Sequence, residues 1–363
     1  MVDDLTQESF QTGKAVVTVS VDLITAIAEA CKRSEEMNPG LNAEQKDTLL
    51  TKVVDKVTSN YKETHGSLKS FNREGKEVTH MDVNDERTAE ILKKWAAAKQ
   101  AQRKEAYELI DNTCSEMMAS GDSFRQYLNV QGSFDRYSVA NAILVSAQMP
   151  EATQLKEYSK WKANRVYVNK DAQKIIILEP SKKYTREDGT KGISYNAKVV
   201  YDISETSAKD RQQEQEPKSM RELVSALIDA SPVPCVPVGE LELPAYYDSS
   251  QQTIFVKKGL SEEVLFVSMA KEVSAAVYDF KYNESRDASD FKSFCVAYMV
   301  SSRYGVDTKG FDFSRLPSEY AEMDTQAFKG ELGTMRDVLG EIQNDMYKSM
   351  EKNKPAKNKE QER

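Results

Sequence analysis

Histidine is almost absent from this chain of 363 residues, which contains only His65 and His80. Both lie in a polar stretch without helical or strand periodicity, so we expect them to have structural or incidental roles. Cysteine is also scarce, and no Cys-x-x-Cys pair occurs among the four positions, Cys31, Cys114, Cys235 and Cys295. Four separated cysteines in a chain of this length are typical of reduced, buried thiols and argue against a disulfide framework.

Long apolar segments are missing as well. No run approaches the roughly 18 apolar residues that a membrane span needs, and Asp22 and Glu29 interrupt the stretch 15–31. The first five residues are acidic where a secretion signal would be basic and then apolar. We therefore expect a soluble, cytoplasmic protein with no membrane partner.

The chain as a whole lacks positive charge. Its 50 lysines and arginines are outnumbered by 58 acids, which gives a net charge of −8 and a pI of about 5.2. Such a chain does not coat duplex DNA indiscriminately, so any nucleic-acid site must be local. A length of 363 residues predicts two to three domains.

One segment reverses this charge. From Lys156 to Lys198, eleven cations stand against five acids, a local balance of +6 that leaves −14 for the rest of the chain. Five aromatic residues are interleaved with the cations: Tyr158, Trp161, Tyr167, Tyr184 and Tyr195. Cations follow a phosphate backbone, and aromatic faces stack on unpaired bases of any sequence. The combination predicts binding of single-stranded nucleic acid.

Periodicity predicts helices before this segment and a mixed region around it. Helices are expected at 20–37, 42–61, 85–120, 137–149 and 153–162, with a loop at 65–84. Strands are expected at 165–168, 174–179 and 194–201, the last two joined by a hairpin with Asp188-Gly189 as its turn. Farther on, we expect helices at 220–228, 261–280, 289–304 and 324–348, and a hairpin of 245–248 with 253–257.

An ordered series of short motifs covers the basic segment and the residues before it. The series contains Phe134–Asn141 (FDRYSVAN), Gln148–Thr153 (QMPEAT), Tyr158 with Trp161, and Lys174–Pro180 (KIIILEP). It resembles the single-stranded-DNA-binding domain of ArdC-type antirestriction proteins. The chain departs from the family at 169–174, where the glycines usual before the apolar strand are missing. If those glycines allow close backbone approach to phosphate, that interaction is weakened here.

The resemblance continues into a zinc-peptidase-like region. Relatives carry a His-Glu-x-x-His helix there, with a third ligand, Glu, one helix later. This chain has Lys271 and Ala275 in the histidine positions and Phe294 in the third, and only Glu272 survives, which we expect to be a surface or ion-paired residue. An ammonium, a methyl and a phenyl group cannot hold Zn²⁺. We therefore expect a zincin-like fold without metal, cofactor or catalysis.

The resemblance and the element pattern together predict an α+β protein of two domains with an additional helical region. The expected parts are a helical region at 1–121, a small α/β DNA-binding domain at 122–206, a linker at 207–219, a mostly helical zincin-like domain at 220–350 and a disordered tail at 351–363. The basis for the linker and the tail is their polar composition without apolar periodicity.

The candidate site residues are of two kinds. Tyr137 and Asn141, with Gln148, either contact nucleic acid or fix a helix start next to Ser138 and the turn that follows. Trp161 either stacks on bases or lies in the core. The full predicted set for DNA binding is Tyr137, Asn141, Tyr158, Lys160, Trp161, Lys162, Arg165, Lys170, Lys174, Lys182, Lys183 and Arg186.

The preferred hypothesis is a non-catalytic protein that binds single-stranded DNA. The resemblance implies antirestriction, or handling of transferred DNA, on a mobile genetic element that moves by conjugation. Two alternatives stay open. One is a protein-interaction module that docks through its N-terminal helices, with decayed DNA and zinc sites. The other is a divergent metallopeptidase with ligands around Glu272, Asp279, Asp287 and Asp290.

Overall fold

The computed structural model describes residues 7–12, 15–20, 30, 34, 49–50, 52–53, 56–57, 70–72, 86–185, 189–209 and 218–352. The chain divides into two compact units. One comprises Met1–Tyr107 and Leu178–Ala197, and the other comprises Glu108–Ile177 and Lys198–Arg363. Helices and small three-stranded sheets occur together, which confirms the predicted α+β class. The predicted domain boundaries stay predictions, and most of the expected linker and tail lies outside the described residues.

The first unit contains an antiparallel sheet of β1 (Gln7–Thr12), β2 (Ala15–Ser20) and β3 (Ser70–Asn72), in the order β1-β2-β3. The sequence periodicity predicts only helices and a loop in this region, and that prediction is wrong at these strands. The sequence of β2, AVVTVS, is rich in β-branched residues, which favour a pleated strand over a helix. Most residues of the expected helices at 20–37 and 42–61, with His65 and His80, lie outside the described residues.

Helix α3 (Glu86–Ala119) confirms the long helix expected at 85–120. The predicted hairpin is formed by β5 (Ile175–Thr185) and β6 (Lys191–Asp202), both longer than expected. Gly189 has a φ of +81°, which agrees with its predicted place in the turn, while Asp188 lies outside the described residues. A two-residue strand, β4 (Leu155–Lys156), pairs antiparallel with β6, so the sheet order is β4-β6-β5.

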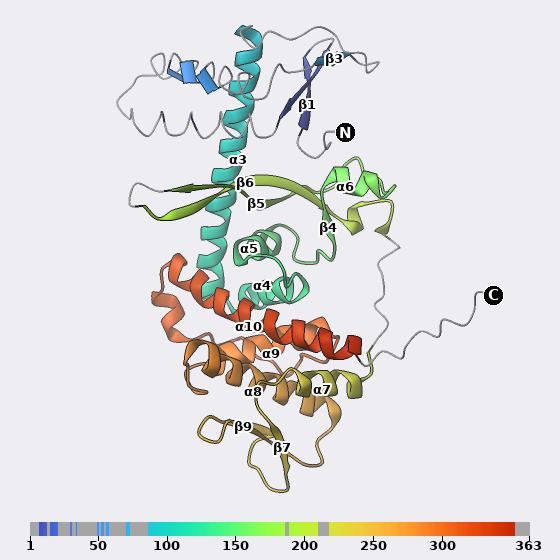
Figure 1. Cartoon of the computed structure of the whole chain (residues 1–363), viewed down its shortest axis with the longest axis vertical. Coiled ribbons are helices and arrows are strands. Elements are labelled where there is room, and N and C mark those ends of the chain that lie inside the picture. The colour runs from blue at the N-terminus through green and yellow to red at the C-terminus, as the bar shows by residue number, and fades with distance from the viewer. Residues whose placement is uncertain are drawn as a thin grey trace, which may run out of the picture. The chain divides into compact units, whose positions relative to one another are not determined.

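The second unit is mainly helical. Besides the last residues of α3, its helices are α4 (Gly121–Ser133), α5 (Val139–Gln148), α6 (Tyr158–Ala163), α7 (Met220–Asp229), α8 (Glu262–Tyr282), α9 (Asp290–Arg303) and α10 (Thr325–Lys352). A sheet of β7 (Cys235–Val238), β9 (Thr253–Lys257) and β8 (Ala245–Asp248) lies beside α8. Helix α9 packs against α4, α8 and α10, and α10 also packs against α7 (Figure 1). All helices predicted from 137 onward are present, with the one expected at 153–162 shortened to α6, whereas the periodicity predicts neither α4 nor β7.

Helix α4 is held tightly against α9 and the residues that follow α9. A Cβ at Gly121 would lie 1.7 Å from the carbonyl oxygen of Phe313, so only glycine permits this approach. Tyr298 donates a hydrogen bond from its hydroxyl to Oδ1 of Asn129 at 2.7 Å. Residues of the expected DNA-binding region and of the expected zincin-like region thus share one core. That core includes a group of packed rings around Phe124.

The cysteines in the described part of the chain carry free thiols. Cys114 and Cys295 are buried, and Cys235 is partly buried. Burial raises the pKa of the Cys114 thiol to about 11, so this group is protonated at neutral pH. These observations agree with the prediction of reduced thiols, while Cys31 lies outside the described residues.

Candidate nucleic-acid interface

Helix α6 is fastened to β6 by Trp161. The Trp161 side chain is 2% exposed and packs with Val166, Ile203 and Ala208. Its indole N–H donates to the carbonyl oxygen of Tyr201 at 2.9 Å, and one ring face is covered by the ammonium group of Lys156, 4.6 Å from the ring centroid. This ring has no free face for a base. The structure therefore corrects the prediction that Trp161 stacks on DNA, because burial of the large apolar ring outweighs exposure.

The side chains around this anchor point outward. Tyr158 is 55% exposed and Tyr167 is 66% exposed. Five predicted cations of the same segment are also exposed: Lys160, Lys162, Arg165, Lys170 and Lys174. We call residues 158–174 the α6 surface. Tyr167 is one of the aromatic residues interleaved with cations in the sequence, but it does not belong to the predicted site.

The loop after α6 is fixed by its backbone. Arg165 adopts a φ of +57°, and its N–H donates to the carbonyl oxygen of Lys162 at 2.9 Å, so the chain reverses direction there. The N–H of Tyr167 donates to Oγ of Ser207 at 3.0 Å, and the N–H of Ser207 donates to the Tyr167 carbonyl at 2.8 Å. Residue 168 forms an isolated bridge with residue 206, so the strand expected at 165–168 is reduced to one pair. These hydrogen bonds fix the backbone of Tyr167, while its side chain is exposed.

One acidic side chain lies beside this basic surface. Oε1 of Glu157 is 3.0 Å from Nζ of Lys160 and 2.7 Å from Nζ of Lys198. Burial alone would raise the pKa of Glu157, but hydrogen bonds from Lys198 and Lys160 outweigh it and hold the pKa below its ordinary value. The carboxylate is therefore ionised at neutral pH. It neutralises part of the local positive charge.

The polar motif residues before α6 serve the framework. Ser138 is the N-cap of α5, and its hydroxyl oxygen accepts from the N–H of Asn141 at 3.3 Å. Tyr137 is half-buried, its ring lies near Phe134 with centroids 5.0 Å apart, and its pKa is raised by burial. The Gln148 amide both donates to the carbonyl of residue 176 and accepts from its N–H, each at 2.9 Å. These contacts match the capping and turn-fixing alternative, while a DNA contact by Tyr137 or Asn141 stays a prediction.

DNA contact by the three predicted cations of the hairpin also stays a prediction. Lys182 and Lys183 belong to β5. The structure describes the backbone at these two positions but not the side chains. Arg186 lies outside the described residues. The predicted cations with described side chains therefore all belong to the segment 158–174.

The surviving acid of the zincin-like motif is engaged in structure. Glu272 is 3% exposed on α8. Its two oxygens accept from Nε and Nη2 of Arg286, both at 2.8 Å, and Oε2 also accepts from the N–H of Tyr247 in β8 at 2.8 Å. The guanidinium group lies 4.9 Å from the ring centroid of Tyr246. A carboxylate so occupied joins the sheet edge to the loop after α8, in agreement with the expected ion-paired role.

The three positions at which relatives carry metal ligands do not suit a metal in this chain. Nζ of Lys271 is 2.7 Å from Oδ1 of Asp290, so an ion pair joins α8 to α9 there. Ala275 is buried, and the ring of Phe294 packs against two phenylalanine rings, those of residues 311 and 313, with centroid distances of 4.9 and 5.3 Å. Across residues 86–185, 189–209 and 218–352 and the shorter described pieces, no group of three His, Cys, Asp or Glu could hold a metal ion. The residues present therefore do not fit a zinc centre.

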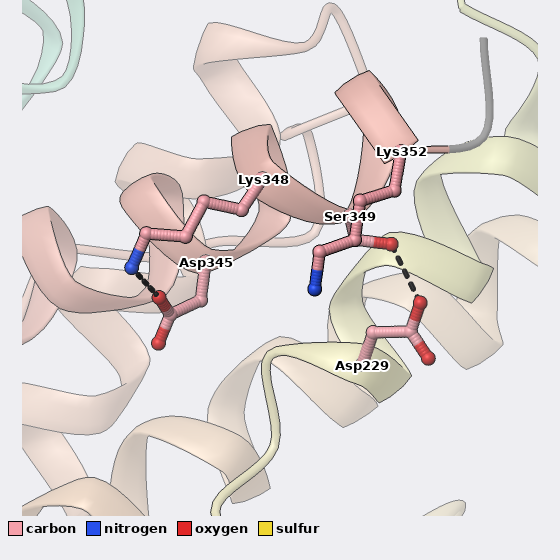
Figure 2. Close-up of a pocket in the computed structure, with 5 residues that line it drawn as sticks. All are labelled: Asp229, Asp345, Lys348, Ser349 and Lys352. Carbon is pink, nitrogen blue, oxygen red and sulfur yellow. Dashed lines mark hydrogen bonds and ion pairs between the residues drawn. The ribbon is translucent and has the colours of Figure 1, made fainter.

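A separate pocket of about 420 Å³ lies between the ends of α7 and α10. Figure 2 shows the hydroxyl of Ser349 donating to Asp229 and the ammonium of Lys348 paired with Asp345, at 2.6 and 2.7 Å. Lys352 extends into the space between these pairs. The pocket is lined by two lysines and two aspartates, so it offers no net charge to a polyanion.

Within the described helices, none combines the length and apolarity required to cross a bilayer. No protein-family model matches the sequence, and no curated protein matches it. Among solved structures, the chain is similar to crystal structures of the antirestriction protein ArdC from the R388 plasmid, one metal-free and one with Mn(II) bound. Each is 14% identical, with TM-scores of 0.43 and 0.44, and each comparison covers 68% of this chain and 97% of the other.

Proposed function

We propose that this protein binds single-stranded DNA without catalysis, through the α6 surface. The observation that supports the proposal most directly is the exposure of Tyr158 and Tyr167 on one segment with five exposed cations. Aromatic rings stack on bases of any sequence, and cations between them attract the phosphates. In duplex DNA the bases are already stacked on one another, so exposed rings favour the unpaired form.

The sequence resemblance to ArdC-type proteins suggests the purpose. It favours antirestriction or the handling of transferred DNA, with occlusion of the strand in place of bond cleavage. The host would be a mobile genetic element. Single-stranded DNA is the ligand that this purpose requires, and the α6 surface is suited to it.

The test is fluorescence anisotropy of the full chain with single- and double-stranded oligonucleotides over a salt series. Tyr158→Ala and Tyr167→Ala should each weaken single-strand binding by about 5- to 150-fold, because stacking on one base contributes roughly 1–3 kcal/mol. Tyr347→Ala is the matched control, since Tyr347 is 60% exposed on α10. Equal weakening in all three variants, or equal binding of both DNA forms, would contradict the proposal.

The cations are tested by charge-matched triple variants. Lys160/Lys162/Arg165→Ala should lower the affinity and flatten its salt dependence by about 0.7 in log–log slope for each phosphate that the variant no longer binds. Lys257/Lys258/Lys309→Ala removes the same charge from exposed positions outside the α6 surface and should leave the slope unchanged. If both triple variants lower the affinity and the slope equally, DNA binding depends on the net charge of the protein and not on the α6 surface.

We also propose that the region of α8 and α9 is not a peptidase. The ion pairs of Glu272 with Arg286 and of Lys271 with Asp290 support this, because they occupy the positions that a metal site would need. Metal analysis of the purified chain decides the matter. Stoichiometric zinc would reinstate the divergent metallopeptidase.

A protein-interaction module is the second candidate function. The ion pairs of Lys160 and Lys198 with Glu157 favour it, because paired lysines attract phosphate less strongly. It predicts negligible and equal binding of single- and double-stranded DNA. A docking role for the N-terminal helices stays a prediction, since most of those residues lie outside the described part of the chain.

A further inference from the structure

Lys198 does not belong to the predicted site, yet the structure brings it to the edge of the α6 surface. It lies on β6, and its ammonium group is 2.7 Å from Oε1 of Glu157. Lys160 reaches the same oxygen from α6 at 3.0 Å. Two ammonium groups from different elements thus converge on one carboxylate oxygen.

The local fold fixes this convergence. Lys156 pairs with Tyr201 in the β4–β6 ladder, which places Glu157 beside β6. Trp161, bonded to the Tyr201 carbonyl, holds α6 against the same strand. The Glu157 side chain is 21% exposed and that of Lys198 is 23% exposed, so both remain within reach of solvent and of a ligand.

The carboxylate of Glu157 is not required to hold the helix. Glu157 occupies the N-cap position of α6, but its side chain makes no cap hydrogen bond to the helix backbone. It points instead to the two lysines, at a position where a side chain often satisfies the first N–H groups of a helix. The side chain can therefore leave the lysines without breaking a backbone hydrogen bond of α6.

We propose that Lys160 and Lys198 form a phosphate subsite for single-stranded DNA, and that Glu157 occupies this subsite in the free protein. The inference rests on the proposed function. Two ammonium groups that hold one carboxylate oxygen can hold a backbone phosphate oxygen by the same charge-assisted hydrogen bonds. A phosphate that enters competes with Glu157 for the two ammonium groups, so Glu157 limits the affinity for DNA.

The test compares Glu157→Gln with Asp171→Asn in the full chain. Both variants remove one negative charge, and Asp171 is exposed on the α6 surface but takes no part in the Glu157 ion pairs. Glu157→Gln should raise single-strand affinity by about threefold or more beyond Asp171→Asn. It should also steepen the salt dependence by about 0.7 in log–log slope for each phosphate newly engaged.

Lys198→Ala completes the test. In this background Glu157→Gln should lose most of its gain, because one half of the subsite is gone. Thermal unfolding of each variant checks that the fold is retained. An affinity for Glu157→Gln equal to or below that of Asp171→Asn overturns the subsite while leaving the proposed function intact. Absence of single-strand binding by the unmodified chain overturns both.

Discussion

Trp161→Ala separates a framework role from a stacking role. The side chain is 2% exposed, and its removal leaves a cavity among Val166, Ile203 and Ala208. Substitutions of this kind cost about 3–5 kcal/mol. The variant also lacks the indole hydrogen bond to the Tyr201 carbonyl, which is left without that partner. We expect the free energy of unfolding of this region to fall by about 3–5 kcal/mol.

Urea denaturation followed by far-UV circular dichroism measures the change, and hydrogen exchange of β6 amides locates it. Trp161→Phe is the control, because it keeps an apolar ring but removes the N–H donor, and it should cost about 1–3 kcal/mol. A second assay uses the Trp95→Phe variant, in which Trp161 is the only tryptophan. Acrylamide should quench its fluorescence poorly, and single-stranded DNA should leave the emission nearly unchanged.

If Trp161 instead stacks on DNA, both assays should give the opposite result. Trp161→Ala would then cost less than about 1 kcal/mol of stability, while single-strand affinity would fall by the amount of one stacked base. Strong quenching of Trp161 by DNA would have the same meaning. Either outcome would refute the reasoning from burial and would return Trp161 to the set of DNA-binding residues.

Two further predictions concern the core of the second unit. Arg286→Ala should lower the free energy of unfolding by about 3 kcal/mol in urea denaturation, because it leaves the carboxylate of Glu272 buried without its cation; a change near zero would mean that water replaces the guanidinium group. Gly121→Ala should cost about 1–3 kcal/mol in the same assay, since its Cβ would meet the Phe313 carbonyl oxygen at 1.7 Å. Gly340→Ala, with no atom near the added Cβ, should instead stabilise α10 by about 0.5–1 kcal/mol, and the same sign for both would contradict the packing argument.

Elements can be predicted from the sequence where apolar periodicity is long. Helices α3, α8, α9 and α10 begin and end within a few residues of their expected bounds. Helix α4 escapes prediction because a glycine such as Gly121 is typical of a helix end, whereas here it begins the next helix. The reason for that glycine is its contact with Phe313, nearly two hundred residues away in the chain. Local pattern cannot reveal such a contact.

The α6 surface shows a similar limit. Tyr158 and Trp161 are three residues apart on a helix of six residues, a spacing that normally places two side chains on neighbouring parts of one face. One is nevertheless exposed and the other buried. The choice depends on the Tyr201 carbonyl and the apolar residues near β6, which supply a partner for an indole. Composition identifies the segment but cannot decide which ring faces solvent.

The motif residues and the candidate binding residues have different structural roles in this fold. Ser138, Gln148 and Asp202 bond to backbone groups, and Asp202 accepts from the N–H groups of Thr153 and Gln154 at 2.8 Å. Such side chains must keep their type and spacing, because each satisfies a particular backbone group. The exposed cations and tyrosines lie between these positions in the chain, with their side chains open to solvent. A motif therefore predicts the framework, and the ligand must be inferred from the residues that the framework leaves exposed.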